Sequence, residues 1–302
     1  MNATAISLIL SSAVLHAYWN LRSKQENPSL TTFWVAMGFL FCGSVLLLCI
    51  VPNLLINISR EVMGLLMLTG VFEAIYFVGL ASSYRTGDMT AVYPIVRALP
   101  ILIVALFSIL SGHGQAFSIY ALVGMLLIVI GCLLVPIDHE KQIGFRHYLT
   151  RTNIFAMLAA AGTSGYMLVD DTALKILRSV SALSVAQVWI TVLYTMLSFS
   201  STFIILGSVV LASKEQRLAL KSITKQQIGR SSLTGLMILV TYLLVLISLA
   251  HVRDVSYATA FRQVSVIFGL LLGMLLLKEK PGTVRISGTL LIFVGLVLVA
   301  LG

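Results

Sequence analysis

The chain has 302 residues, of which 59% are hydrophobic and 10% are charged, and its formal net charge is +9. A soluble domain of this size carries roughly 25% charged residues and about 45–50% apolar ones. This shortage of charge excludes a soluble protein built around one large core. The mean hydropathy of +1.02 indicates an integral membrane protein instead.

Apolar runs long enough to cross a bilayer recur along the whole chain. A transmembrane helix needs about 20 mostly apolar residues, and the short connections leave no room for a separate soluble domain. The first run is interpreted as a span and not as a cleaved signal peptide, because no basic residue precedes it and it has no clear cleavage pattern of small residues. The sequence therefore predicts an all-α membrane protein with ten transmembrane helices, at residues 3–22, 31–51, 62–83, 89–110, 116–136, 152–172, 184–212, 231–250, 256–277 and 284–301.

The basic residues are divided unevenly between the two predicted sides of the membrane. Of the 20 Lys and Arg residues, 14 lie in loops on one side and 4 on the side that carries both termini, while Arg97 and Arg262 lie within spans. Basic loops stay in the cytoplasm, so both termini are expected outside, in a multi-pass protein of the inner (plasma) membrane. The positive charge reflects topology, and nucleic acid is not an expected partner.

The reactive side chains do not form a recognisable catalytic or metal-binding pattern. The cysteines, Cys42, Cys49 and Cys132, lie in apolar segments without metal-ligand spacing and are interpreted as packing residues. No nucleophile is accompanied by a base, and no Gly-rich phosphate loop with its Lys is present. We therefore expect no enzyme activity, no metal and no cofactor.

The fifth and tenth predicted spans resemble each other. Residues 124–135 and 288–299 are identical at seven of their twelve positions. The preceding segments also correspond in the same order, with Asp88, Arg97 and Pro100 matched by Asp254, Arg262 and Ser265. The glycine pairs at 124/131 and 288/295 each share one helical face and are interpreted as close packing sites.

This likeness divides the chain into a first repeat at 1–137, a basic connecting loop at 138–152 and a second repeat at 153–302. Five spans is an odd number, so equivalent helices run in opposite directions and the repeats are inverted. Inverted repeats are typical of transporters that expose a central site to each face in turn. Duplication in a channel or a membrane enzyme is the alternative.

Arg97 and Arg262 are charged groups inside predicted spans. Each reaches about 10–12 Å inward from opposite faces at roughly 1.5 Å per residue, so both are expected near the midplane. A guanidinium suits an anionic group because its planar fork donates two hydrogen bonds at once. The alternative is internal pairing of Arg97 with Glu73 and of Arg262 with Asp170. Glu73 is either a carrier of a coupling proton or a permanently ionised partner of an arginine.

Further polar and aromatic residues are candidates for a pocket at the same depth. His16 lies in the second half of the first span, and packing between helices is its alternative role. Pro94 and Pro100 predict a flexible or broken fourth helix beside Arg97. The aromatic candidates, which could equally serve in packing or at the membrane interface, are Trp19, Tyr76, Tyr93, Tyr166 and Tyr257. The basic segment 213–230 is expected to lie on the cytoplasmic surface.

Short motifs in a fixed order add a resemblance that covers the whole chain. They are His16-Ala-Tyr-Trp-Asn20, Tyr84-Arg-Thr-Gly-Asp88, Val92-Tyr-Pro-Ile-Val-Arg97, Tyr166-Met-Leu-Val-Asp170, Phe261-Arg-Gln-Val-Ser265 and Leu276-Leu-Lys-Glu279. The chain resembles the EamA-type transporters of the drug/metabolite transporter superfamily. One departure is the turn Ser111-Gly-His-Gly114, which lacks the usual Gly-Glu.

The resemblance implies a helical basket whose cavity is lined by spans 1, 3, 4, 6, 8 and 9, with spans 5 and 10 packed behind. Members of the family move amino acids, sugars and other small metabolites, often as exporters, without hydrolysing ATP. The motifs add Asn20 and Gln263 to the candidate site. The full set of predicted substrate-binding residues is His16, Trp19, Asn20, Glu73, Tyr76, Tyr93, Arg97, Tyr166, Asp170, Tyr257, Arg262 and Gln263.

The sequence thus predicts a secondary transporter that exports a small polar metabolite by alternating access. An amino acid or a related anionic or zwitterionic compound is the expected cargo. A flippase for a lipid-linked sugar or headgroup is the alternative, and an intramembrane enzyme is a third possibility. The expected partners are a small-molecule substrate and membrane lipid, with a homodimer as a candidate assembly.

Overall fold

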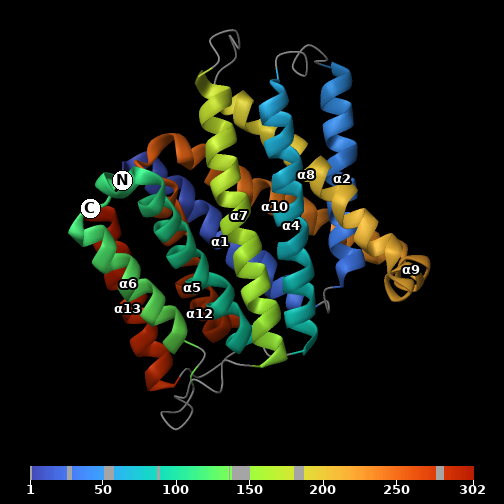
Figure 1. Ribbon diagram of the computed structural model, residues 1–302. Helices are drawn as coiled ribbons and strands as arrows, with labels where there is room; N and C mark the ends of the chain where they lie inside the picture. Colours follow the sequence, from blue (N-terminus) through green and yellow to red (C-terminus); the bar gives the residue numbers. More distant parts are fainter. Residues whose placement is uncertain are drawn as a thin grey trace.

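The computed structural model is a bundle of long α-helices (Figure 1), and it describes residues 2–25, 29–50, 58–86, 89–135, 137, 150–179, 187–276 and 282–302. The long helices are α1 (Ala3–Gln25), α2 (Leu30–Ile50), α4 (Arg60–Thr86), α5 (Met89–Ser108), α6 (Ile119–Leu134), α7 (Arg151–Ser179), α8 (Gln187–Ala212), α10 (Lys225–Ser248), α12 (Val264–Leu276) and α13 (Thr283–Leu301). The short elements are η1 (Ile109–His113), η2 (Gly114–Ala116), α9 (Lys214–Lys221), η5 (Leu249–His251) and α11 (Val255–Phe261).

Within the described part of the chain, eight helical segments are long and apolar enough to cross a membrane. They correspond to the predicted spans other than the fourth and fifth. Those two fall on shorter apolar helices, Val96–Gly112 and Ile119–Leu134. The all-α, multi-pass character expected from the sequence is therefore confirmed.

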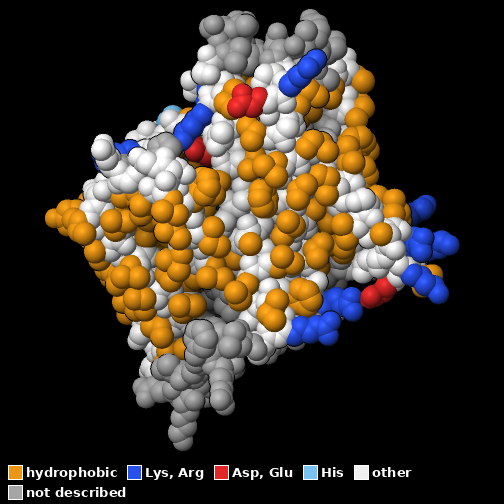
Figure 2. Space-filling view, in the orientation of Figure 1, with side chains coloured by type: hydrophobic (Ala, Val, Ile, Leu, Met, Phe, Trp, Pro, Cys, Tyr) orange, Lys and Arg blue, Asp and Glu red, His pale blue; other side chains and the backbone are white. Residues whose placement is uncertain are grey.

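Many large apolar side chains face outward, and small and polar side chains are frequent in the interior. Leu110, Ile119 and Leu290 are 76%, 68% and 59% exposed, whereas Thr195 and Thr202 are fully buried. Hydrophobic side chains cover the middle of the face shown in Figure 2, and Lys and Arg lie at its rim, notably beside α9. Small and polar residues between helices allow close packing in a bilayer, where apolar surface gains nothing by being buried.

The cysteines divide between these two environments. Cys132 is buried, as expected of a packing residue, but Cys42 and Cys49 are exposed on α2. The packing role predicted for all three was therefore wrong for two of them. An apolar sequence context does not distinguish a lipid-facing residue from a buried one.

Helices α6 and α13 pack against each other through their glycines. A Cβ atom at Gly131 would lie 2.5 Å from the carbonyl oxygen of Gly288, and one at Gly124 would lie 2.6 Å from that of Gly295. These pairings run in opposite order along the two helices, so α6 and α13 are antiparallel. The predicted role of these four glycines in close packing is confirmed.

The fourth predicted span was expected to be flexible or broken at its prolines, and the structure shows no break there. Helix α5 continues through Pro94 and Pro100 to Ser108. Proline removes one backbone donor, but the bonds on either side can persist and neighbouring helices support the segment. The helix that is interrupted is instead the ninth, where α11 ends at Phe261 and α12 begins at Val264.

The short helix α9 lies at the edge of the bundle, after α8. Its side chains Lys214, Arg217 and Lys221 are exposed, as expected for a surface segment. Gln216 is buried and anchors the helix, because its Oε1 accepts a hydrogen bond of 2.9 Å from the Thr31 hydroxyl on α2.

Candidate functional site

A central cavity lies between helices from both halves of the chain. It has two adjoining lobes, which share four lining residues: His16, Tyr76, Tyr166 and Arg262. These residues come from α1, α4, α7 and the interruption between α11 and α12. The cavity therefore depends on helices that are far apart in sequence.

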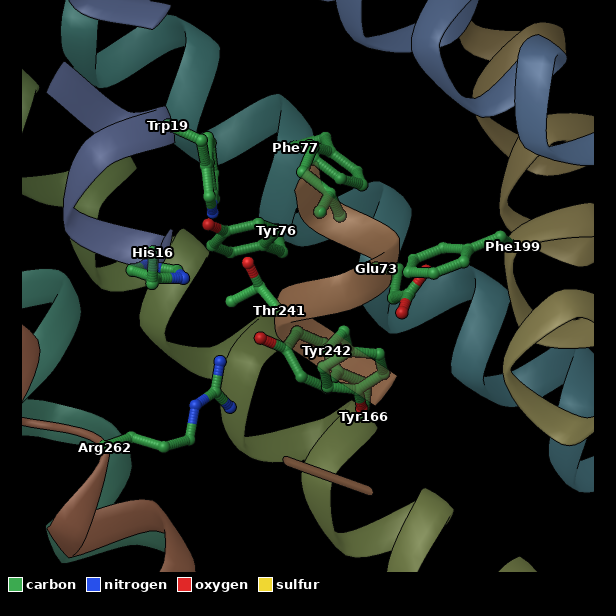
Figure 3. Close-up of a pocket in the computed structure, with 11 residues that line it drawn as sticks. His16, Trp19, Glu73, Tyr76, Phe77, Tyr166, Phe199, Thr241, Tyr242 and Arg262 are labelled. Atoms are coloured by element: carbon green, nitrogen blue, oxygen red, sulfur yellow. The ribbon is translucent and has the colours of Figure 1, made fainter. Parts of the chain in front are cut away.

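The first lobe is mainly aromatic, and we call it the aromatic lobe (Figure 3). Besides the shared residues it is lined by Trp19, Glu73, Phe77, Phe199, Ile238, Thr241 and Tyr242. The Tyr166 ring meets Tyr76 and Tyr242 edge-on, at centroid distances of 5.9 Å and 5.4 Å. Edge-to-face contacts of this kind stabilise the wall and fix the orientation of its rings.

The second lobe contains both candidate arginines, and we call it the arginine lobe. Besides the shared residues it is lined by Val96, Arg97, Pro100, Thr163, Thr259 and Gln263. Arg97 and Arg262 are only 6% and 8% exposed. No acidic side chain is among the described residues that line this lobe, so its lining carries net positive charge.

Arg262 lies at the interruption of the ninth helix. The backbone N–H groups of Gln263 and Ser265 bond to Ala260 and Arg262, three residues back instead of four. This tight turn lets Arg262 and Gln263 both line the arginine lobe. The Arg262 guanidinium donates to the Met167 sulfur at 3.1 Å and lies 6.0 Å from the centre of the Tyr242 ring.

The ion pair between Arg262 and Asp170 considered above does not form. Asp170 is fully buried behind the cavity, where its Oδ1 accepts hydrogen bonds from Thr69 at 2.5 Å and Tyr194 at 2.6 Å. Its Oδ2 accepts one from the Tyr242 hydroxyl. Asp170 thus holds Tyr242 in place instead of lining the cavity itself.

Glu73 lines the aromatic lobe and is 3% exposed. Its Oε2 accepts a hydrogen bond of 2.5 Å from Thr202. Within the described residues, no ion pair joins Glu73 to Arg97, so the second pairing considered above is not formed either. Glu73 is therefore a buried carboxyl group at the cavity with one hydroxyl donor.

Of the twelve predicted site residues, eight line the cavity: His16, Trp19, Glu73, Tyr76, Arg97, Tyr166, Arg262 and Gln263. Asn20 supports α1 by donating to the His16 carbonyl at 2.8 Å. Tyr257 is buried beside Phe117, with their rings stacked 6.0 Å apart. The side chain of Tyr93 lies outside the described part of the structure.

Several lining residues were not among the residues predicted from the sequence, chiefly Phe77, Phe199, Thr241 and Tyr242. Tyr242 could have been predicted as a lining residue, because it is a tyrosine within a predicted span, as are Tyr76 and Tyr166. Phe199 and Phe77 could not, since most phenylalanines in apolar helices face lipid or neighbouring helices. Within the described residues, no group of three or more His, Cys, Asp or Glu side chains could hold a metal ion.

Comparisons with known proteins bear on the fold. No family model matches the chain, and no curated protein does. Among solved structures 27 chains match. One of them, described as "Crystal structure of protein", superposes with a TM-score of 0.65 at 12% identity, over 100% of this chain and 98% of its own. At that identity the likeness shows a shared fold alone.

Proposed function

We propose that the protein is a secondary transporter of the inner membrane with ten spans in two inverted five-span repeats. It exports a small metabolite that carries an acidic group, such as an amino acid or a related compound. Arg97 and Arg262 bind the acidic group, and Glu73 carries a coupling proton. The EamA-like motifs of the sequence support this family assignment.

The helix contacts support the inverted repeat. The repeat equates α1, α2, α4, α5 and α6 with α7, α8, α10, α11–α12 and α13. Under this equivalence the packing of α4 on α7 has a counterpart in α1 on α10. Likewise α4 on α8 has a counterpart in α2 on α10, and α5 on α7 in α1 on α12. The antiparallel pair of α6 and α13 is its own counterpart.

The strongest support for an anion-binding site comes from the contacts of Arg262. A charged residue at the centre of a membrane helix costs roughly 2.5–3.5 kcal/mol on insertion scales. The Arg262 guanidinium contacts a sulfur atom and an aromatic ring, neither of which neutralises its charge. A carboxylate bound in the arginine lobe would do so, and it would also be within reach of Arg97.

The interrupted ninth helix supports alternating access. A turn at Arg262 and Gln263 places the proposed anion site at a point where two short helices can change their relative angle. Rocking of one repeat against the other would then expose the same site to each side of the membrane in turn. The excess of basic residues in one set of loops places that side in the cytoplasm.

The anion site can be tested by ligand-induced thermal stabilisation of the purified protein. The probes are amino acids, phosphonates, sugars, inorganic cations and glycerophosphate headgroups. A ligand at 100 times its Kd stabilises the folded state by about 2.7 kcal/mol. We expect acidic or zwitterionic probes to stabilise the wild type and to bind Arg262→Gln and Arg97→Gln at least about thirtyfold more weakly, a loss of about 2 kcal/mol.

Arg253→Gln is the matched control, because Arg253 is exposed and donates to the Gly302 carbonyl away from the cavity. It should bind the same probes as tightly as the wild type. Unchanged binding in both cavity variants would overturn the anion site. Stabilisation by glycerophosphate headgroups alone would favour the flippase instead.

A further inference from the structure

Two residues that line the cavity each carry a buried polar atom without a hydrogen-bond partner within the protein: Nε1 of Trp19 and Oε1 of Gln263. Both side chains are 3% exposed. In the described structure a third such atom, Arg178 Nε, belongs to a guanidinium that is held by Thr191 and Leu246. Buried polar groups are nearly always bonded, so two exceptions at one cavity point to a ligand.

The orientation of the Gln263 amide is determined by its own helix. Its Nε2 donates a hydrogen bond of 2.8 Å to the Thr259 carbonyl. If the amide were flipped, two oxygen atoms would face each other there, so the assignment does not rest on the similar appearance of N and O. The amide oxygen of Gln263 is therefore an acceptor without a donor, on a residue that lines the arginine lobe.

This acceptor lies beside the proposed anion site. Gln263 follows Arg262 directly, and both line the arginine lobe together with Arg97. A carboxylate has acceptor atoms only, so it satisfies the guanidinium groups but leaves Gln263 Oε1 without a partner. An acid with an amino or hydroxyl group on the neighbouring carbon satisfies both at once.

The unpaired donor of Trp19 belongs to a residue that lines the aromatic lobe and not the arginine lobe. The two lobes therefore differ in polarity. The arginine lobe is lined by both arginines and by Gln263, which carries the unpaired acceptor, whereas the aromatic lobe shares Arg262 and adds Glu73, several rings and the indole of Trp19. This arrangement places the acid and its neighbouring donor group in the arginine lobe and the rest of the cargo among the rings.

We propose that Gln263 recognises a hydrogen-bond donor next to the acid group of the cargo. The protein therefore selects α-amino or α-hydroxy acids over the same acids without that group. This proposal rests on the proposed function, because it takes the anion to be bound by the arginines. It assigns Gln263 as a specificity-determining residue.

The test uses three matched sets of probes with purified protein in detergent, and Kd is measured by titration calorimetry. The sets are L-alanine, lactate and propanoate; L-leucine, 2-hydroxy-4-methylpentanoate and 4-methylpentanoate; and L-aspartate, malate and succinate. In at least one set, we expect the amino acid or the hydroxy acid to bind at least tenfold more tightly than the plain acid. Which of the two binds distinguishes an ammonium donor from a hydroxyl donor.

Gln263→Met keeps the length of the side chain and removes its acceptor. We expect this variant to lose the tenfold preference while its Kd for the plain acid changes less than twofold, which also shows that it is folded. Gln226→Met, on the exposed start of α10, should retain the preference.

Equal binding of plain and substituted acids in the wild type would overturn the proposal, as would a preference that survives in Gln263→Met. In either case the anion site would still stand, since acids would still bind. If none of the nine probes binds, the selection of α-amino or α-hydroxy acids is wrong. The phosphonates and other probes described above then decide the transporter proposal separately.

Discussion

The two buried carboxyl groups, Glu73 and Asp170, differ in what surrounds them. Asp170 accepts three hydroxyl hydrogen bonds, from Thr69, Tyr194 and Tyr242. These donors hold the carboxyl group in a fixed orientation. Glu73 has a single donor, Thr202, and borders the cavity. Its position makes Glu73 the better candidate for exchanging a proton with cargo or water, and Asp170 a positioning residue for Tyr242.

Tyr242→Phe tests this role of Asp170. The substitution keeps the ring beside Arg262 but removes one of three donors to a buried carboxylate, which should destabilise the protein by about 1–3 kcal/mol. A lower midpoint of thermal unfolding in detergent is the expected result. Tyr120→Phe, at a side chain that is 59% exposed, should leave the midpoint unchanged. An unfolding midpoint equal to that of the wild type would show that Asp170 does not depend on Tyr242.

The two arginines of the site could be predicted from the sequence, but the side chains around them could not. Arg97 and Arg262 are conspicuous because a charge within an apolar run is costly. Asp170 is equally conspicuous, yet its three donors lie 24 to 101 positions away on α4, α8 and α10. Hydroxyl groups are common in membrane helices, so which of them meets a given carboxylate depends on how the helices are rotated. Pairing with Arg262 was one of the two alternatives considered for Asp170, and the structure does not contain that pair.

At the scale of helices, the backbones of α6 and α13 approach each other closely at their glycines, as the sequence predicted. Gly131 and Gly288 face each other, as do Gly124 and Gly295. The seven-residue spacing in each helix was sufficient to predict one packing face. It did not say what that face would contact, because any helix with small residues could have filled the place.

Gly131→Ala is expected to force the two helices apart, because the new Cβ would lie 2.5 Å from the Gly288 carbonyl oxygen. Overpacking of this kind typically costs about 1–3 kcal/mol. The measurement is again the midpoint of thermal unfolding. Gly64→Ala is the control, since a Cβ at Gly64 in α4 meets nothing within 4 Å. If both variants unfold at the same temperature, the contact between α6 and α13 is not tight.

No local sequence feature predicted the interruption of the ninth helix. Proline and glycine are the usual marks of a broken helix, and neither occurs at Arg262 or Gln263. The turn is supported by side chains instead, since Gln263 donates to the Thr259 carbonyl and Arg262 reaches Met167 on α7. Prolines in α5 predicted a break that the structure does not have, so tertiary contacts outweighed local propensity in both helices.

At the scale of the whole molecule, the distribution of charge predicts the orientation in the membrane. Lys221, at the end of α9, and Arg253, before α11, are both exposed and belong to opposite predicted sides. Because basic loops are retained in the cytoplasm, Lys221 should face the cytoplasm and Arg253 the outside.

Cysteine labelling tests this orientation in a background without Cys42, Cys49 and Cys132. A membrane-impermeant maleimide should label Arg253→Cys in intact cells, and should label Lys221→Cys only after the cells are made permeable. The reverse pattern would place both termini in the cytoplasm and contradict the predicted topology. Equal labelling of both positions in intact cells would show that the membrane was leaky, and the parent without cysteines gives the background.

The sequence by itself determined the class of the protein and the approximate position of its apolar helices, and it marked two arginines within them. These properties follow from local composition, because the thickness of the bilayer sets the length of a span and the cost of a charge within it. The tertiary structure decided which side chains line the cavity, that Asp170 lies behind Tyr242, and that the ninth helix turns at Arg262. Those features depend on the rotation and packing of helices that are distant in sequence, and no local pattern encodes them.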